Sequence, residues 1–297
     1  MKLSQAEIDQ FNSEGYLVAC GALHDRDLDP VIAEYEAYID RRAEELVDQG
    51  HIKQTYANEP FERRLIGICQ EYGDIYGELD IMHFRGRACF EFLSNPNLID
   101  LVEGLVGPEI TCSPIQHVRP KLPAGMTPGG RDAHEVPWHQ DAGVTWEEAD
   151  PYFILTVWLP LTAATEKNGC LEIIPQTHGR GLWEHESRRG FGTTIVEEAM
   201  PEEEGKMLPM EKGDVLLMHK EIPHRSRGNF SDGIRWSMDL RYQKTGTPTG
   251  RPMQPDFPVR SASNPDSVLT DHEEWCRRWI EALASSPERS LHRWQPV

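Results

Sequence analysis

The stretch Ile234-Arg235-Trp236-Ser237-Met238-Asp239-Leu240-Arg241-Tyr242 alternates strictly between apolar and polar side chains. Because successive side chains of a β-strand point to opposite faces, this pattern predicts a strand with one apolar and one polar face. The apolar face can pack under a layer of helices, whereas the polar face must look into water or a polar cavity. The stretch therefore indicates a sheet that helices cover on one side, with Arg235 on the other side.

Further strand-like runs, separated by proline and glycine, occupy the second half of the chain at 111–118, 153–161, 170–174 and 214–219. Short runs of this kind, with turn residues between them, predict an antiparallel all-β core. In the run 153–161, Thr156 and Trp158 share a face that lies opposite to the apolar residues of the same run. We therefore expect these two side chains to line a cavity.

Helical patterns flank this core. The segment 4–14, with Ser4 as a possible cap, predicts a short helix before a strand at 16–18, and apolar residues three or four apart predict an amphipathic helix over 28–50. Residues 97–106 and 271–284 predict two more helices, whereas the segment 51–82 gives no clear pattern. The tail 248–267 is rich in proline, serine and aspartate, so we expect it to follow the surface. With no repeat and no linker, residues 1–297 are expected to form one domain.

Composition limits the partners and the compartment. Hydrophobic residues make up 38% and charged residues 27%, as in ordinary globular proteins. The formal net charge of −19 disfavours nucleic-acid and membrane partners. Without an apolar leader or a run of about 18 apolar residues, we expect a cytoplasmic protein. The six cysteines form no CxxC pair, so we expect them to be reduced.

The segment Trp138-His139-Gln140-Asp141 contains the first candidate metal ligands. On extended backbone, His139 and Asp141 point to the same side, so both can bind one metal ion. A second imidazole from a distant strand would complete a two-histidine, one-carboxylate site, which is typical of non-haem iron(II) oxygenases. His224 is the best candidate for that imidazole, and the alternatives are His117, His134 and His219.

Arg235 follows His224 by eleven residues and lies on the polar face of the alternating strand. A guanidinium there can form a bidentate pair with a carboxylate of a metal-bound keto acid. The alternative is a structural ion pair of Arg235 with Asp232 or Asp239. The spacing thus places an anion site beside a candidate metal site.

Four motifs occur in a fixed order: WHQD at 138–141, NGCLEIIPQTH at 168–178, GDVLLMH at 213–219 and HRSRGNFSDGIR at 224–235. Together they resemble the phytanoyl-CoA dioxygenase family of iron(II)- and 2-oxoglutarate-dependent oxygenases. The resemblance begins at Gly15-Tyr16-Leu17-Val18 and continues to about Gln243, which is most of the chain.

The resemblance implies a double-stranded β-helix, also called a jelly roll or cupin-like fold, buttressed by N-terminal and C-terminal helices. It also implies residue roles. His139, Asp141 and His224 match the iron ligands, Arg235 matches the arginine that binds the distal carboxylate of 2-oxoglutarate, and Ser226 and Lys121 match further positions that contact this co-substrate. Thr156 is a further candidate for such a contact because its strand position faces the expected cavity.

The implied reaction consumes O2 and 2-oxoglutarate, releases succinate and carbon dioxide, and hydroxylates an unactivated C–H bond of a small-molecule substrate. Ascorbate is expected only as a non-specific reductant. An anionic substrate would fit a rim of arginines at positions 119, 131, 225 and 227. The alternatives are a zinc- or manganese-dependent cupin-type hydrolase or isomerase, and a non-catalytic binding module. The sequence gives neither the substrate's identity nor the oligomeric state.

Overall fold

The computed structural model describes residues 2–126, 135–188, 192–285 and 293–294. Its larger sheet is antiparallel and contains β1 (Tyr16–Ala19), β10 (Val215–His219), β5 (Ile154–Pro160), β12 (Arg235–Lys244), β2 (Glu109–Cys112) and β13 (Phe257–Ser261) in that spatial order, while β3 (His117–Lys121) also pairs with β12. A smaller sheet contains β4 (Val136–His139), β11 (His224–Ser226), β6 (Leu171–Ile173) and β9 (Lys206–Leu208). The strands β7 (His185–Arg188) and β8 (Gly192–Ile195) form a hairpin.

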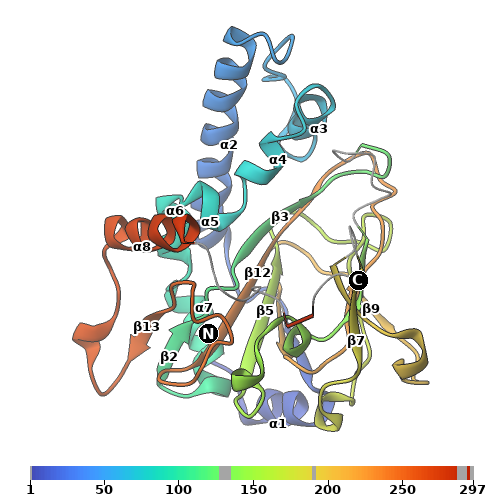
Figure 1. The fold of residues 1–297 in the computed structure, drawn as a ribbon, viewed down its shortest axis with the longest axis vertical. Helices are drawn as coiled ribbons and strands as arrows, with labels where there is room; N and C mark the ends of the chain where they lie inside the picture. Colours follow the sequence, from blue (N-terminus) through green and yellow to red (C-terminus); the bar gives the residue numbers. More distant parts are fainter. Residues whose placement is uncertain (1, 127–134, 189–191, 286–292, 295–297) are drawn as a thin grey trace.

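Helices cover one side of the larger sheet. They are α1 (Gln5–Glu14), α2 (Asp25–Asp48), α3 (Phe61–Glu71), α4 (Ile75–Glu78), α5 (Ile81–Phe84), α6 (Arg87–Phe92), α7 (Pro96–Val106) and α8 (His272–Ala284). In Figure 1, α2 to α6 and α8 lie on one side of β3, β12 and β5, whereas β7 and β9 lie on the other side. The predicted all-β core with flanking helices is therefore confirmed.

The alternation of 234–242 decides how β12 is placed. Its apolar side chains are completely buried in a core that contains residues of α2, α3 and α7. The ring of Trp236 lies 4.6 Å from that of Phe61 and 5.7 Å from that of Tyr35, and the hydroxyl of Tyr242 donates to the carbonyl of Leu93. Because this face is held under the helices, the polar face is fixed toward the smaller sheet.

Two expectations from the sequence are wrong in part. The run 111–118 is not one strand: β2 ends at Cys112 and β3 begins at His117, and the two pair with different parts of β12. The tail 248–267 does not only follow the surface, because β13 lies within it and pairs with β2. Phe257 is buried against Phe90 and the larger sheet, so this strand completes the core.

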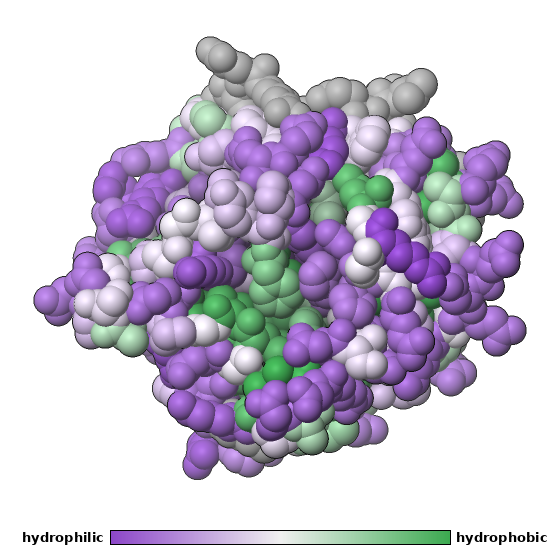
Figure 2. All heavy atoms as spheres, turned by 90° about the horizontal axis from the view of Figure 1, so that it is seen from below, coloured by the Kyte–Doolittle hydropathy of each residue, from purple (hydrophilic) through white to green (hydrophobic). Residues whose placement is uncertain are grey.

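The outer surface is mainly polar, in keeping with the charge of the chain. Figure 2 shows a face dominated by hydrophilic side chains, with apolar side chains gathered near its middle. None of the described helices has the length and apolarity that crossing a membrane would need. All six cysteines are free. The division of residues 1–297 into a single domain stays a prediction.

Helix α1 begins with a complete capping box, as the position of Ser4 suggested. The backbone N–H of Ser4 donates to the Glu7 carboxylate at 2.7 Å, and the Ser4 hydroxyl accepts from the N–H of Glu7. We expect Ser4→Ala to lower the free energy of unfolding by about 1 kcal/mol in urea titrations, because one helical N–H loses its acceptor. Ser13→Ala, in the exposed last turn of the same helix, is the control. Equal midpoints for Ser4→Ala and the wild type would contradict this expectation.

Candidate metal centre and cavity

A cavity of about 320 Å³ lies at the polar face of β12. Arg235, Ser237, Asp239 and Arg241 all line it, as the period of two requires for residues on one face. The predicted position of Thr156 and Trp158 is also confirmed, because both side chains line the same cavity from β5. The volume is at the lower end of the ~300–1,000 Å³ range typical of small-molecule sites.

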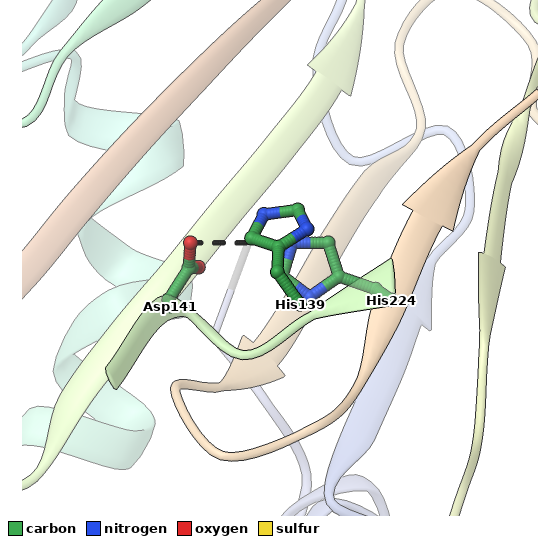
Figure 3. Close-up of side chains that lie close together, drawn as sticks. All are labelled: His139, Asp141 and His224. Carbon is green, nitrogen blue, oxygen red and sulfur yellow. Dashed lines mark ion pairs between the residues drawn. The ribbon is translucent and has the colours of Figure 1, made fainter. Parts of the chain in front are cut away.

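His139, Asp141 and His224 come together in this cavity (Figure 3). His139 is the last residue of β4 and faces His224, the first residue of β11, across the smaller sheet, while Asp141 begins the turn that follows β4. One potential ligand atom from each residue lies within 4.8 Å of the others, and Nε2 of His224 is 4.0 Å from Oδ1 of Asp141. Within the described part of the chain, this is the cluster whose donor atoms are arranged to hold a metal ion.

The alternative histidines lie elsewhere or have other partners. The ring of His219 packs against those of Phe153 and His178. His117 lines the cavity, but its Nδ1 lies 2.8 Å from the carboxylate of Asp80. His134 falls outside the described residues. The geometry therefore favours His224 as the second imidazole.

Backbone carbonyl groups orient both imidazoles of the cluster. Nδ1 of His139 is 2.9 Å from the carbonyl oxygen of Pro137, and Nδ1 of His224 is 3.0 Å from that of Ile222. A carbonyl oxygen can only accept, so each Nδ1 carries a hydrogen and Nε2 is the ring nitrogen that can bind a metal ion. Burial, together with the nearby His224, lowers the pKa of His139 to about 3, which keeps this imidazole neutral. Both rings are thus prepared to bind a cation.

The carboxylate of Asp141 is held by two buried side chains. Nη2 of Arg241 lies 2.5 Å from Oδ1 of Asp141, and the hydroxyl of Thr156 donates to Oδ2. Arg241 also contacts Asp239, with Nη1 2.6 Å from Oδ1. Although burial by itself would raise the pKa of Asp141, the Arg241 guanidinium holds it well below its usual range. Asp141 is therefore an ionised carboxylate in a fixed orientation.

Arg235 is a buried arginine that forms no ion pair with a carboxylate of the described residues. Its Nη1 donates to the hydroxyl of Ser237 at 2.9 Å, its Nη2 lies 3.5 Å from the hydroxyl of Ser226, and its guanidinium stacks on Trp158. Its Nε has no hydrogen-bond partner among the described residues.

The proposed ion-pair partners of Arg235 are engaged with other arginines. Asp232 pairs with Arg63 on the surface, and Asp239 pairs with Arg241. The arrangement of Arg235 therefore suits an external anion better than the structural ion pair that the sequence left open.

Two further candidates contact protein groups. Lys121 faces Arg235 in the pairing of β3 with β12, but its amine donates to the carbonyl of Arg227 at 2.6 Å, and it does not line the cavity. Burial lowers the pKa of Lys121 to about 6. Thr156 lines the cavity, and its hydroxyl donates to the Asp141 carboxylate. A direct contact of either side chain with a co-substrate stays a prediction.

The sequence reasoning missed two buried arginines of the cavity, Arg241 and Arg251. Arg241 could have been found, because it shares the polar face of 234–242 with Arg235 and pairs in register with Thr156. Arg251 lies in the tail that was expected to follow the surface, and no local pattern marks it as buried.

Comparisons with known proteins agree with this site. The model of the phytanoyl-CoA dioxygenase (PhyH) family matches residues 11–237. Among curated proteins, the chain is 36% identical over 125 residues to the 1-deoxypentalenic acid 11-beta-hydroxylase of Streptomyces arenae, a match that covers 39% of this chain and 43% of that protein. It is 24% identical over 242 residues to the peroxisomal phytanoyl-CoA dioxygenase of Rattus norvegicus, covering 78% and 66%. The matches thus span less than two thirds of either relative.

Solved structures share the fold. The apo form of the non-heme monooxygenase ThoJ superposes with a TM-score of 0.58 at 18% identity, covering 93% of this chain and 96% of that chain. The epimerase SnoN, in complex with Fe3+, alpha ketoglutarate and nogalamycin RO, gives a TM-score of 0.54 at 19% identity, covering 83% and 86%. The shared fold agrees with the match of the family model to residues 11–237. Because that match covers most of the sequence, the chain belongs to the phytanoyl-CoA dioxygenase (PhyH) family.

Proposed function

We propose that this protein is an Fe(II)- and 2-oxoglutarate-dependent oxygenase that hydroxylates an unactivated C–H bond of a small molecule. One observation carries the proposal: a cluster of two imidazoles and one carboxylate shares a cavity with the guanidinium of Arg235, which forms no ion pair with a carboxylate of the described residues. The family of the chain and the hydroxylase name of a relative support the same reaction class.

His139, Asp141 and His224 fit a ferrous ion. Two nitrogen donors and one carboxylate oxygen would hold the ion and would leave it able to bind co-substrates. When bound, iron and 2-oxoglutarate would use O2 to oxidise a substrate C–H bond, with release of succinate and carbon dioxide. Because Arg241 and Thr156 hold Asp141, the ligand set is fixed before the ion binds.

Arg235 fits the distal carboxylate of 2-oxoglutarate. Its guanidinium is positioned by Ser237, Ser226 and the ring of Trp158, so little side-chain entropy is lost when an anion binds. A hydrolase with zinc in the same cluster would use the three ligands but would leave this buried cation without a role. The hydroxyl of Ser226 accepts from Nη2 of Arg235 and donates to the carbonyl of Gly169, so it helps to hold the guanidinium, and a direct contact of Ser226 with the same carboxylate stays a prediction.

We also propose that the substrate is a small molecule and that the protein needs no nucleic-acid or membrane partner. The reactive cluster lies at a cavity of about 320 Å³, which admits a small molecule and not a folded macromolecule. The formal charge of −19 would repel phosphate-rich surfaces. A cytoplasmic location stays a prediction.

The direct test is co-substrate turnover. Protein supplied with Fe(II), ascorbate, O2 and 2-oxoglutarate labelled at C1 is expected to release labelled carbon dioxide and an equal amount of succinate, and candidate small molecules should be screened for stimulation of this release. Zn(II) in place of Fe(II) is expected to give no release, because zinc has no redox chemistry. Hydrolysis supported by Zn(II) would argue for the hydrolase alternative, and absence of turnover with any metal would argue for the non-catalytic binding module.

Thr156→Val is expected to weaken iron binding by roughly 10- to 100-fold, because the Asp141 carboxylate loses a hydrogen bond that orients it. The apparent dissociation constant is measured by anaerobic titration with Fe(II). Thr111→Val is a matched control, because Thr111 is a buried threonine of the same sheet whose hydroxyl contacts Thr245 outside the cavity. Equal iron affinity in both variants would show that Thr156 does not support the ligand.

A further inference from the structure

A second buried arginine, Arg251, lines the same cavity. Its side chain is 6% exposed, its Nη2 donates to the carbonyl of Val144 at 2.7 Å, and its Nε has no hydrogen-bond partner among the described residues. Within the described part of the chain, Arg251 also forms no ion pair with a carboxylate. It is therefore a buried cation that the protein leaves uncompensated.

The loop that carries Arg251 is firmly held. The N–H of Trp146 donates to the carbonyl of Gly250, and a Cβ at Gly250 would lie 2.6 Å from the Cβ of Thr145. Gly250 also has a φ of +68°, which other residues rarely adopt. The guanidinium of Arg251 is thus fixed against the turn that follows Asp141.

Arg251 and Arg235 line the same cavity but contact different parts of its wall. Arg235 contacts Ser226 and begins β12, whereas Arg251 contacts Val144 and lies near Arg241, whose charge adds to burial in lowering the pKa of Arg251 to about 10. Six residues of strand separate Arg235 from Arg241, which is about 20 Å at roughly 3.3 Å per residue. The contacts of Arg251 are therefore separate from those of Arg235, to which the distal carboxylate of 2-oxoglutarate is assigned.

Charge in the cavity contrasts with charge on the whole chain. The formal charge of the chain is −19, yet the described lining contains five arginines and only two aspartates. Both aspartates, Asp141 and Asp239, contact Arg241, and Arg225 pairs with Glu172 at the rim. When 2-oxoglutarate is bound to Arg235, Arg251 is the buried arginine of the described lining that still has no counterion. Burial of an unpaired charge is costly, so an anionic group of a ligand would be bound favourably there.

Resting on the proposed function, we infer that Arg251 binds a carboxylate of the substrate, and that the substrate is a small carboxylic acid with an apolar body. A planar carboxylate matches the guanidinium fork. The cavity also offers apolar surface for the rest of such a molecule, from Ile115, Val136, Val144, Leu171 and Met218. Anchoring at Arg251 fixes which carbon of the substrate lies beside Asp141 and its metal.

A purely structural role of Arg251 has to be separated from anion binding, since its Nη2 also ties the turn at Val144. Arg251→Gln removes the charge but keeps an N–H donor for that carbonyl, and Arg251→Lys keeps the charge. Arg64→Gln is a matched control. Arg64 is a part-buried arginine that also donates to a backbone carbonyl, that of Thr55, but it does not line the cavity.

The test uses the full chain loaded with Mn(II) and saturating 2-oxoglutarate. The added ligands are butanoate, hexanoate, octanoate, benzoate and 3-phenylpropanoate, each compared with its neutral amide. Paramagnetic relaxation of the ligand protons reports both affinity and proximity to the metal. We expect at least one acid to bind the wild type and Arg64→Gln about tenfold more tightly than its amide, and Arg251→Gln to lose that preference, with Arg251→Lys keeping part of it.

The outcomes separate this inference from the proposed function. If the protons of 2-oxoglutarate itself are not relaxed by the metal, the proposed function fails. If they are relaxed, but no acid binds better than its amide, or Arg251→Gln keeps the preference, the carboxylate site is refuted while the oxygenase remains. Unchanged 2-oxoglutarate affinity in Arg251→Gln is expected, because that co-substrate is assigned to Arg235.

Discussion

His224→Ala is expected to reduce succinate formation from 2-oxoglutarate by at least about 100-fold and to abolish stoichiometric binding of Fe(II). The two remaining ligands, His139 and Asp141, are two residues apart at the end of β4 and supply only two of the three protein donor atoms. Loss of an outer group that only orients a ligand already costs about 10- to 100-fold in metal affinity, so loss of a ligand costs more. Succinate release and equilibrium dialysis with Fe(II) measure the two effects.

His219→Ala provides the matched control. His219 ends β10 five residues before His224 and is also largely buried, but its ring packs against Phe153 and His178 rather than the cluster. Iron binding and succinate release should survive in this variant. Wild-type turnover in His224→Ala, or loss of iron from a folded His219→Ala protein, would mean that the wrong histidine has been assigned.

Arg235→Ala is expected to raise the concentration of 2-oxoglutarate that gives half-maximal turnover by roughly 10- to 100-fold. The loss of charged hydrogen bonds worth about 1.5–3 kcal/mol accounts for this factor. Turnover at saturating 2-oxoglutarate should fall much less, since Arg235 contacts the distal carboxylate and not the reacting end. Steady-state kinetics with varied 2-oxoglutarate separate these two quantities.

Arg63→Ala is the control for this prediction. Arg63 pairs with Asp232 on the surface close to the start of β12, so its removal changes the local charge equally but leaves the cavity intact. A lower turnover number at unchanged 2-oxoglutarate requirement in Arg235→Ala would place the guanidinium beside the reacting centre instead of at the distal carboxylate.

The part of the site that the sequence predicts is the part encoded by local periodicity. The alternation of 234–242 assigns each side chain to a face, and the structure places Arg235 and Arg241 on the cavity side and Trp236 in the core. The two-residue spacing of His139 and Asp141 likewise places both beside His224, although Asp141 begins a turn instead of continuing the strand.

What the sequence does not predict depends on pairing between distant segments. The contact of Arg241 with Asp141 follows from the register of β12 on β5, which places Arg241 opposite Thr156. Arg251 is buried because its loop packs on the turn after Asp141, and Phe257 because β13 pairs with β2. No periodicity within these short segments encodes such neighbours, so composition alone assigned them to the surface.

We propose that His139, Asp141 and His224 hold a ferrous ion to which 2-oxoglutarate binds. An anaerobic titration of the protein with Fe(II) in the presence of 2-oxoglutarate tests it most directly, because a 2-oxo acid chelated to ferrous iron gives a weak visible charge-transfer absorption. We predict a band that saturates at one equivalent of Fe(II) and is missing in His224→Ala. A wild-type protein that gives no band at saturating Fe(II) and 2-oxoglutarate would contradict the account.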